Sequence, residues 1–426
     1  MGTLSLADAA IRAGADRPSW WSRMWSEPGA RRAAVCTAAA DSMVTDSAAG
    51  GSAWGIGSKV NNGSVNVRPD GASPTPLLVA AKARGFRTGL VTTTRLTDAT
   101  PASFVANVPK RSMEDAVAVQ TLERGVDVLL GGGGRHFQVA DLERVRAQVL
   151  RSRKELLAAP AQAATSSGSG SGPLVGLFAD GSMAFEIDRG DAQPSVAEMS
   201  RAAIARLAAA TEGAERGFIL QIEGGRVDHA AHGNDAAALV RDQMAFDEAV
   251  GVALEFARSR ANGRAGELGD TLVVVTTDHA NANPGMTVYG KAGEAGLRRL
   301  LAAQHSFEWI LQRLGGLRDP AEMADDLPAV VREAMGFELS ATELAWVRRR
   351  LVERQPVNGF SEADTTESAL GAVLSNHFGV AFLSVNHTAD LVDCVAWGPG
   401  AERLEPRIEN TDLHGIVCDA VGVASA

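Results

Sequence analysis

The chain has 426 residues, of which 45% are apolar and 22% are charged. This length allows one large domain or two smaller ones, and the composition is that of a globular protein. The net charge of −10 is offset by no basic tract, which argues against a nucleic-acid partner. No apolar run reaches about 18 residues, so we expect no membrane span. The N-terminal residues also lack the pattern of a signal peptide.

Cysteine content sets a second limit. Cys36, Cys394 and Cys418 are widely spaced and form no C-x-x-C pair, so we expect no cysteine-based zinc site. Buried, reduced thiols are the simplest interpretation. A single disulfide is the alternative that the sequence leaves open.

Short apolar runs along the chain predict strands. Continuous runs of this kind suit strands that are buried on both faces of a mainly parallel sheet. In chain order they lie at residues 87–93, 126–130, 218–222, 271–276 and 382–385.

Helical signals lie before and between these strands. An amphipathic stretch at residues 4–11 predicts an N-terminal helix, in which Asp8 lies. Capping boxes, in which a serine and a glutamate three residues later satisfy each other's backbone amides, predict two further helix starts. They are Ser195-x-x-Glu198 and Ser340-x-x-Glu343.

Strands that alternate with helices predict an α/β fold: a three-layer sandwich around a mainly parallel sheet. We interpret residues 1–426 as a single domain. Residues 158–172 are rich in Gly, Ser and Ala and predict a flexible, low-complexity surface loop. Residues 281–378 contain no convincing strand and predict a mostly helical cap inserted into the domain.

Acidic and histidine side chains follow several predicted strands. Asp228 and His232 are four residues apart and therefore share one face of a helical turn. Ligands in α/β folds bind at the carboxyl ends of strands, so this placement favours a metal site. The candidate ligands are Glu223, Asp228, His232, Asp278, His279 and His387.

Each of these features also has a structural interpretation. Asp228 and His232 fit a solvated helix face, and Asp278-His279 fits a hydrogen-bonded loop pair. A lone histidine such as His387 is commonly structural. Spacing alone does not decide between these interpretations and a metal site.

Seven segments in order resemble the alkaline phosphatase family. They are TDSAAGGSAWGIGSKVNNGSVNV at 45–67, TTTRLTDATPASFVANVPKR at 92–111, DVLLGGGGRHF at 127–137, GLFADGSMAFEIDR at 176–189, ILQIEGGRVDHAAH at 219–232, VVVTTDHANANPGM at 273–286 and NHTADLVDCVAWGPGA at 386–401. The resemblance covers nearly the whole chain, and an ordered set is far more specific than a single motif.

The resemblance implies a phosphoryl-transfer site. Ser47 corresponds to the nucleophile that becomes phosphorylated. Arg111 corresponds to the arginine that binds phosphate, a role that suits the planar fork of a guanidinium. Asp46 corresponds to the residue that positions this arginine.

The resemblance also implies three metal ions, two Zn²⁺ and one Mg²⁺. Asp228, His232 and His387 correspond to the first zinc site, and Asp278 and His279 to the second. For the magnesium site the ligands are Thr100 and Glu223, whose hard oxygen atoms suit that ion. Residues placed beside these sites or the phosphate are Asp98, His229 and Asn281.

The implied function is hydrolysis of small phosphate monoesters through a phosphoserine, by a homodimer outside the cytoplasm. A phosphodiesterase of the same superfamily is an alternative. The family also has a Gly-Asp-Gly segment, on a buried strand, whose Asp bridges two metals. That segment is absent from the given residues, so a truncated, inactive phosphate- or metal-binding relative is a further alternative.

Overall fold

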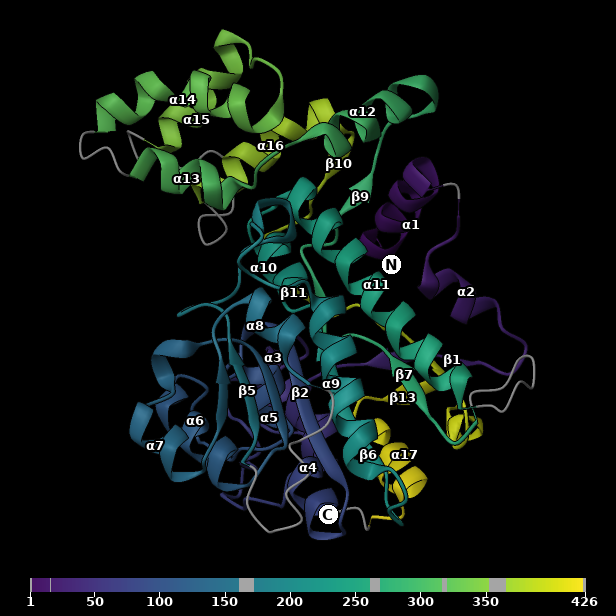
Figure 1. Ribbon diagram of the computed structural model, residues 1–426. Helices are drawn as coiled ribbons and strands as arrows, with labels where there is room; N and C mark the ends of the chain where they lie inside the picture. The colour runs from purple at the N-terminus through teal and green to yellow at the C-terminus, as the bar shows by residue number, and fades with distance from the viewer. Residues whose placement is uncertain are drawn as a thin grey trace.

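A computed structural model describes residues 2–15, 17–160, 172–260, 269–315, 320–351 and 365–423. Strands lie at the centre and helices surround them (Figure 1). Most of the predicted loop at 158–172 lies outside the described residues. Within the described residues, no helix has both the length and the apolar character needed to cross a membrane.

One half of the fold is a fully parallel five-stranded sheet in the order β4-β5-β3-β2-β6. Leu90 and Val91 are neighbours in β2 and pack into hydrophobic clusters on opposite faces, because successive side chains of a strand alternate. The strands are β2 (Arg87–Arg95), β3 (Val128–Gly132), β4 (Gln148–Leu150), β5 (Leu174–Leu177) and β6 (Phe218–Glu223).

Helices cover both faces of this sheet, which confirms the three-layer sandwich. The Val91 face packs against α8 (Arg153–Ala158), α9 (Val196–Thr211) and α11 (Ala236–Ser259). The Leu90 face packs against α3 (Ser47–Ile56), α4 (Leu77–Ala83), α5 (Ala99–Ser103), α6 (Glu114–Glu123) and α7 (Val139–Arg144). The capping box at Ser195 begins α9, as predicted.

A second, four-stranded sheet has the order β13-β1-β12-β7. Its strand β12 (Val392–Trp397) runs antiparallel to β1 (Arg31–Cys36) and β7 (Val273–Val275), whereas β13 (Arg407–Glu409) is parallel to β1. The parallel character expected of the whole fold therefore belongs mainly to the first sheet. β7 is also shorter than the run at 271–276 suggests.

Within the part of the chain that the structure describes, the two sheets share no ladder of hydrogen bonds. β6 ends one sheet and β7 ends the other, and among the described residues neither has a strand partner on its second side. Helix α11 bridges this boundary, because Ala249 packs in the cluster that includes β6, while Leu254 packs with Val275 of β7. Helix α17 (Asp412–Val421) packs in clusters with both edge strands on the opposite face.

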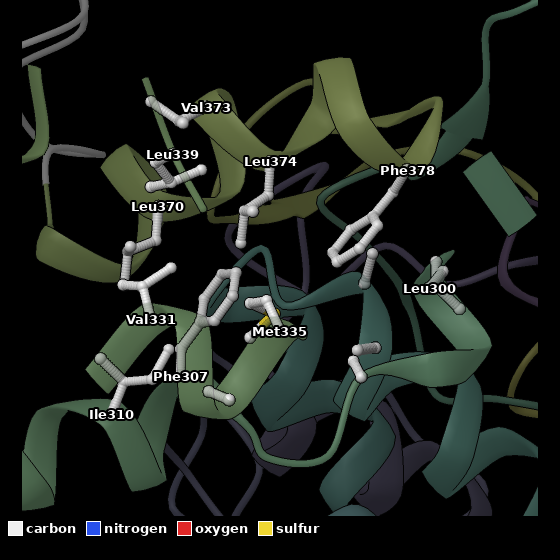
Figure 2. Close-up of a cluster of buried hydrophobic side chains, with 14 of the residues drawn as sticks. Leu300, Phe307, Ile310, Val331, Met335, Leu339, Leu370, Val373, Leu374 and Phe378 are labelled. Atoms are coloured by element: carbon white, nitrogen blue, oxygen red, sulfur yellow. The ribbon is translucent and has the colours of Figure 1, made fainter. Parts of the chain in front are cut away.

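Among the described residues, five helices between β9 and β10 gather at one end of the molecule (Figure 1). Together with α11 and the N-terminal helix α1 (Gly2–Ala15), they enclose an apolar cluster that includes Phe307, Met335, Leu370, Leu374 and Phe378 (Figure 2). The interpretation of residues 281–378 as a cap on a single domain stays a prediction. The helices are α12 (Gly290–Ala302), α13 (Phe307–Gly315), α14 (Pro320–Met335), α15 (Ala341–Leu351) and α16 (Thr366–Phe378).

The strand predicted at 382–385 is wrong. The hydroxyl of Ser384 accepts a hydrogen bond from the Asn386 amide and donates one to the Asn386 carbonyl, which folds this segment into a turn. His387 therefore does not follow a strand but begins one, β11 (His387–Thr388), which pairs with β8 (Ala280–Asn281). A similar short pair joins β9 (Gly285–Met286) to β10 (Val380–Ala381).

The N-terminal helix is present as predicted, as α1 (Gly2–Ala15), with Leu6 and Ile11 buried. Asp8 lies in it and accepts hydrogen bonds from Ser19 and Ser22 near the start of α2 (Trp20–Ser26). All three cysteines are free thiols. The disulfide alternative is therefore not realised in this structure.

Asp235 ties α11 to α13. Its carboxylate accepts hydrogen bonds from the amides of Ala237 and Ala238 at the start of α11 and from the amide of Phe307, which begins α13. We predict that Asp235→Ala lowers the free energy of unfolding by about 1–3 kcal/mol at pH 5, because three amides lose their acceptor. Urea unfolding measures this, with the exposed Glu212→Ala as the matched control.

The penalty should be smaller at pH 8 than at pH 5. Burial raises the pKa of Asp235 from 3.8 to about 6. The folded wild type therefore loses stability as the pH rises through this window, and the alanine variant has no such group. A penalty that increases with pH would contradict this assignment.

Candidate active site

Ser47 is the first residue of α3, and Asp46 caps that helix by accepting a hydrogen bond from the Ala49 amide at 3.0 Å. Small residues let α3 approach its neighbours closely. A Cβ at Gly50 would lie 3.1 Å from the Asp278 Cβ, and a Cβ at Gly51 would lie 2.8 Å from the Ser103 Oγ. The glycines after the serine therefore bring Ser47 against the ends of other elements.

Ser47 lies beside His279. The serine Oγ is 2.9 Å from the His279 Nε2, which is also 3.3 Å from the Asp278 Oδ2. The other ring nitrogen, Nδ1, is buried without a hydrogen-bond partner and lies 4.0 Å from the Asp228 Oδ1. This distance is too long for the hydrogen bond that orients the histidine of a Ser-His-Asp triad.

Two histidines turn their Nε2 atoms toward each other. His232 Nδ1 lies 2.6 Å from the Val385 carbonyl oxygen, and His387 Nδ1 lies 2.7 Å from the Thr45 carbonyl oxygen. Each Nδ1 therefore donates its proton to a carbonyl, and the Nε2 lone pairs face each other at 3.0 Å. Lone pairs this close repel unless a cation or a proton lies between them.

Asp228 completes a candidate ligand set. Its carboxylate lies 3.4 Å from the His232 Nε2 and 3.7 Å from the His387 Nε2. Asp228 and His232 lie on α10 (Arg226–His232), which follows β6. Asn281 donates a hydrogen bond to the Asp228 Oδ1 at 2.6 Å, as partners of metal ligands commonly do. Two imidazoles, each held through its other nitrogen, and one carboxylate fit a zinc ion with an open fourth position.

The pKa values of Asp228, His232 and His387 are shifted by their contacts with one another and by burial. Burial opposes ionisation of Asp228, but its hydrogen bond with His232 and the charges of the three nearby histidines hold the pKa well below the usual value. For His232, burial acts downward, but Asp228 raises the pKa. Burial and the neighbouring His279 lower the pKa of His387.

Oxygen atoms dominate the neighbouring part of the site. Thr92 Oγ1 donates to the Glu223 Oε2 at 2.5 Å, and Thr100 Oγ1 donates to the Asp278 Oδ2 at 3.4 Å. Burial raises the pKa of Glu223 to about 8, and Asp98 and Asp278 add to the shift because they are negative. An acidic, oxygen-only set of this kind fits a hard cation such as magnesium.

Arg111 lies between two carboxylates. Its NH1 is 3.1 Å from the Asp46 Oδ2, and its NH2 is 3.0 Å from the Asp98 Oδ1. Burial acts downward on the pKa of Arg111, but Asp98 and Asp46 raise it overall. Because Asp46 precedes Ser47, this contact fixes a cationic fork near the serine.

His229 connects the candidate active site to helix α13 through Arg226. Its Nδ1 lies 2.8 Å from the Arg226 NH1, and the Arg226 NH2 pairs with Glu308 of α13. The guanidinium also lies 3.6 Å from the centre of the Phe185 ring. Burial, followed by the charge of Arg226, lowers the pKa of His229.

The structure thus brings together all the residues suggested by the sequence, while the roles assigned to them stay predictions. Sequence reasoning missed Thr92, Arg95 and Arg226, which contact the candidate residues Glu223, Asp98 and His229. The available signal was position: Thr92 lies at the end of the strand predicted at 87–93, and Arg95 lies two residues past that end. Arg226 lies in the same ILQIEGGRVDHAAH segment as Asp228 and carried no separate signal.

The fold and the site define a class of α/β proteins in which a serine lies beside histidine and carboxylate groups suited to metal ions. The chain belongs to the alkaline phosphatase family, because the family model described as alkaline phosphatase matches residues 30–423. The chain is also similar to a crystal structure of Thermus thermophilus alkaline phosphatase. That similarity has a TM-score of 0.86 at 30% identity and covers 99% of this chain and 89% of that one.

Curated relatives agree with this assignment. The chain is 38% identical to the repressible alkaline phosphatase of Saccharomyces cerevisiae over an alignment 275 residues long, and the match covers 57% of this chain and 46% of the yeast protein. It is 28% identical to alkaline phosphatase 4 of Bacillus subtilis over an alignment 400 residues long, and this match covers 88% of this chain and 76% of that protein. The match thus spans about half the length of the yeast relative.

The close approach of α3 to α5 gives a prediction. A Cβ at Gly51 would also lie 3.0 Å from the Ser103 Cβ. We expect Gly51→Ala to lower the free energy of unfolding by about 1–3 kcal/mol, because the two helices must move apart.

The matched control is Gly415→Ala in α17, where an added Cβ meets nothing within 4 Å. Here we expect a gain of up to about 1 kcal/mol from the higher helix propensity of alanine. Thermal unfolding measures both variants. If both substitutions stabilise the protein, the packing argument is wrong.

Proposed function

We propose that the chain hydrolyses phosphate monoesters through a phosphorylated Ser47. The observation that carries this proposal is the position of the Ser47 Oγ, 2.9 Å from a histidine nitrogen within a cluster of metal-type ligands. Membership of the alkaline phosphatase family supports the same reaction. Small phosphate monoesters are the proposed substrates.

In the first step, the Ser47 Oγ forms a bond to phosphorus while the bond from phosphorus to the alcohol oxygen breaks. The Ser47 hydroxyl loses its proton in this step, and the alcohol oxygen takes up a proton as it leaves. In the second step, a water oxygen loses a proton and attacks phosphorus, the bond to the Ser47 Oγ breaks, the serine regains a proton, and phosphate is released. Arg111 binds two non-bridging oxygens through its fork in both steps.

The residues proposed to hold metals fall into three sets. Asp228, His232 and His387 would hold one zinc, and Asp278 and His279, with the Ser47 Oγ, a second. Glu223 and Thr100 would hold magnesium. When bound, zinc supplies a lower pKa for the serine hydroxyl and positive charge beside the leaving oxygen.

The remaining groups orient these residues. Asp46 and Asp98 hold Arg111, Asn281 holds the Asp228 carboxylate, and His229 lies near the proposed phosphate position. The family resemblance also supports two further predictions, a homodimer and a location outside the cytoplasm. Gel filtration and fractionation of the native host cells test these.

We predict different losses for the serine and the arginine. Ser47→Ala should reduce kcat by about a thousandfold or more, because no other group forms the covalent intermediate. Arg111→Ala should mainly weaken phosphate binding, by about 2–3 kcal/mol, since it removes charge-assisted hydrogen bonds. Steady-state hydrolysis of an aryl phosphate and inhibition by inorganic phosphate measure these effects.

The exposed neighbour Lys110 provides the matched control for Arg111. Lys110→Ala removes the same charge without touching Asp46 or Asp98. The value of kcat and the inhibition constant for phosphate should therefore stay within about twofold of wild type. Phosphate trapped on a residue other than Ser47 would contradict the proposed covalent step.

Metal removal should abolish activity, and Zn²⁺ with Mg²⁺ should restore it. The first zinc set contains two imidazoles and a carboxylate, whereas the second contains one imidazole, one carboxylate and the serine, whose hydroxyl must lose its proton to bind strongly. We therefore expect the first zinc to resist chelation longer than the second. Metal analysis during dialysis against a chelator measures this order.

Activity that persists after all zinc is lost would overturn the metal assignment. It would instead favour His279 as a direct general base for Ser47, as in serine hydrolases. The His232→Ala variant separates the two chemistries. It should weaken retention of the first zinc, but it does not touch the Ser47–His279 contact.

A further inference from the structure

Arg95 lies at the end of β2, outside the groups assigned so far. Its NH2 is 2.9 Å from the Asp98 Oδ2, and its Nε is 2.8 Å from the Glu114 Oε2. The NH1 lies 3.4 Å from the Ser182 Oγ. The side chain is only 22% exposed, so this arginine is fixed on three sides rather than mobile on the surface.

Asp98 contacts two arginines, one through each of its carboxylate oxygens. Its Oδ1 accepts hydrogen bonds from the Arg111 NH2 at 3.0 Å and from the Ala99 amide at 2.8 Å, whereas its Oδ2 faces Arg95. Both oxygens of this buried carboxylate therefore have a cationic partner. Removing Arg95 would leave Oδ2 without its ion pair, and the carboxylate could rotate away from the plane that holds Arg111.

Glu114 holds Arg95 from the other side. Its Oε2 accepts hydrogen bonds from the Arg95 Nε and, at 2.6 Å, from the Thr97 hydroxyl, and it lies 3.2 Å from the His136 Nε2. The glutamate thus stays in place through contacts that do not depend on Arg95. This arrangement orients Arg95 before any substrate arrives.

The positive charge of Arg95 gives a second reason to expect that this residue affects phosphate binding. Asp46, Arg111 and Asp98 together carry one net negative charge, which opposes a phosphate dianion. Arg95 adds a positive charge that contacts Asp98 directly through NH2, whereas Glu114 contacts the Nε of the same guanidinium. The cation next to Asp98 therefore reduces the repulsion that this carboxylate exerts on an anion bound at Arg111.

We propose that Arg95 is a positioning residue for phosphate, acting through Asp98 on the orientation and effective charge of Arg111. This inference rests on the proposed phosphatase function and names a residue that the reaction steps above do not use. Arg95 does not touch the phosphate in this proposal. Its effect must therefore disappear when Arg111 is absent.

The test measures binding of inorganic phosphate to the zinc-loaded full chain by calorimetry, together with hydrolysis of an aryl phosphate. We expect Arg95→Ala to raise the Kd for phosphate roughly tenfold, and Arg95→Lys roughly threefold. Lysine retains the charge but cannot reach Asp98 and Glu114 through separate nitrogens. Glu114→Gln should move the Kd in the same direction by a smaller factor, because it loosens Arg95 without removing it.

Arg135→Ala is the matched control. This exposed arginine lies beside the group formed by Arg95, Asp98, Glu114 and His136, and within that group it contacts only His136. Its Kd for phosphate should stay within about twofold of wild type. Zinc content and melting temperature, measured for every variant, identify any protein that has lost its fold. Arg95→Lys and Glu114→Gln keep the test available if Arg95→Ala does not fold.

The deciding comparison is made in the Arg111→Ala background. There, Arg95→Ala should change the Kd for phosphate by less than about twofold, because the group it positions is gone. A full tenfold effect in that background would overturn the proposal, as would an unchanged Kd in the single variant. A wild-type protein that holds zinc but neither binds phosphate nor hydrolyses the ester contradicts the proposed function itself, before any variant is compared.

Discussion

The crowding of several carboxylates into a largely buried space is the constraint on which the site depends. Asp46, Asp98, Glu223, Asp228 and Asp278 are grouped at the ends of strands and helices around Ser47. Arginines accompany Asp46 and Asp98, whereas the other three carboxylates face histidines, threonines and one another. Burial, with a further contribution from the charges of Asp98 and Asp278, raises the pKa of Glu223 to about 8, so this acid holds its proton at neutral pH unless further positive charge is present. The site is thus built to receive cations.

The fold supplies this crowding by close packing rather than by long loops. The small residues of α3 let Gly50 lie against Asp278 and Gly51 against α5, and α5 begins at the Asp98 cap. A larger residue at Gly50 or Gly51 would separate groups whose interactions depend on distances of about 3 Å. The same short, glycine-rich segment therefore sets both the packing of α3 and the chemistry of the serine.

Much of this could be predicted from the sequence. Apolar runs identified β2, β3 and β6, because strands buried on both faces need continuous apolar side chains. The family motifs identified the site residues in the sequence, and the distances between these residues are consistent with the roles that the resemblance implies. The strand at 382–385 failed because Ser384 forms a local turn that outweighs an apolar pattern. Arg95 and Arg226 were missed because ion pairs such as those with Glu114 and Glu308 leave no periodic signal in the chain.

Among the described residues no hydrogen-bonded ladder joins the two sheets, and this has a mechanical consequence. The proposed first zinc would take Asp228 and His232 from the helix after β6, and His387 from the segment before β12. These ligands come from opposite sides of the open boundary between β6 and β7. A bound ion would then link the two sheets, and part of its binding free energy would stabilise their association. Loss of the ion would weaken this association. Backbone amides of the edge strands β6 and β7 would then exchange with solvent sooner than amides of the strands at the centre of either sheet.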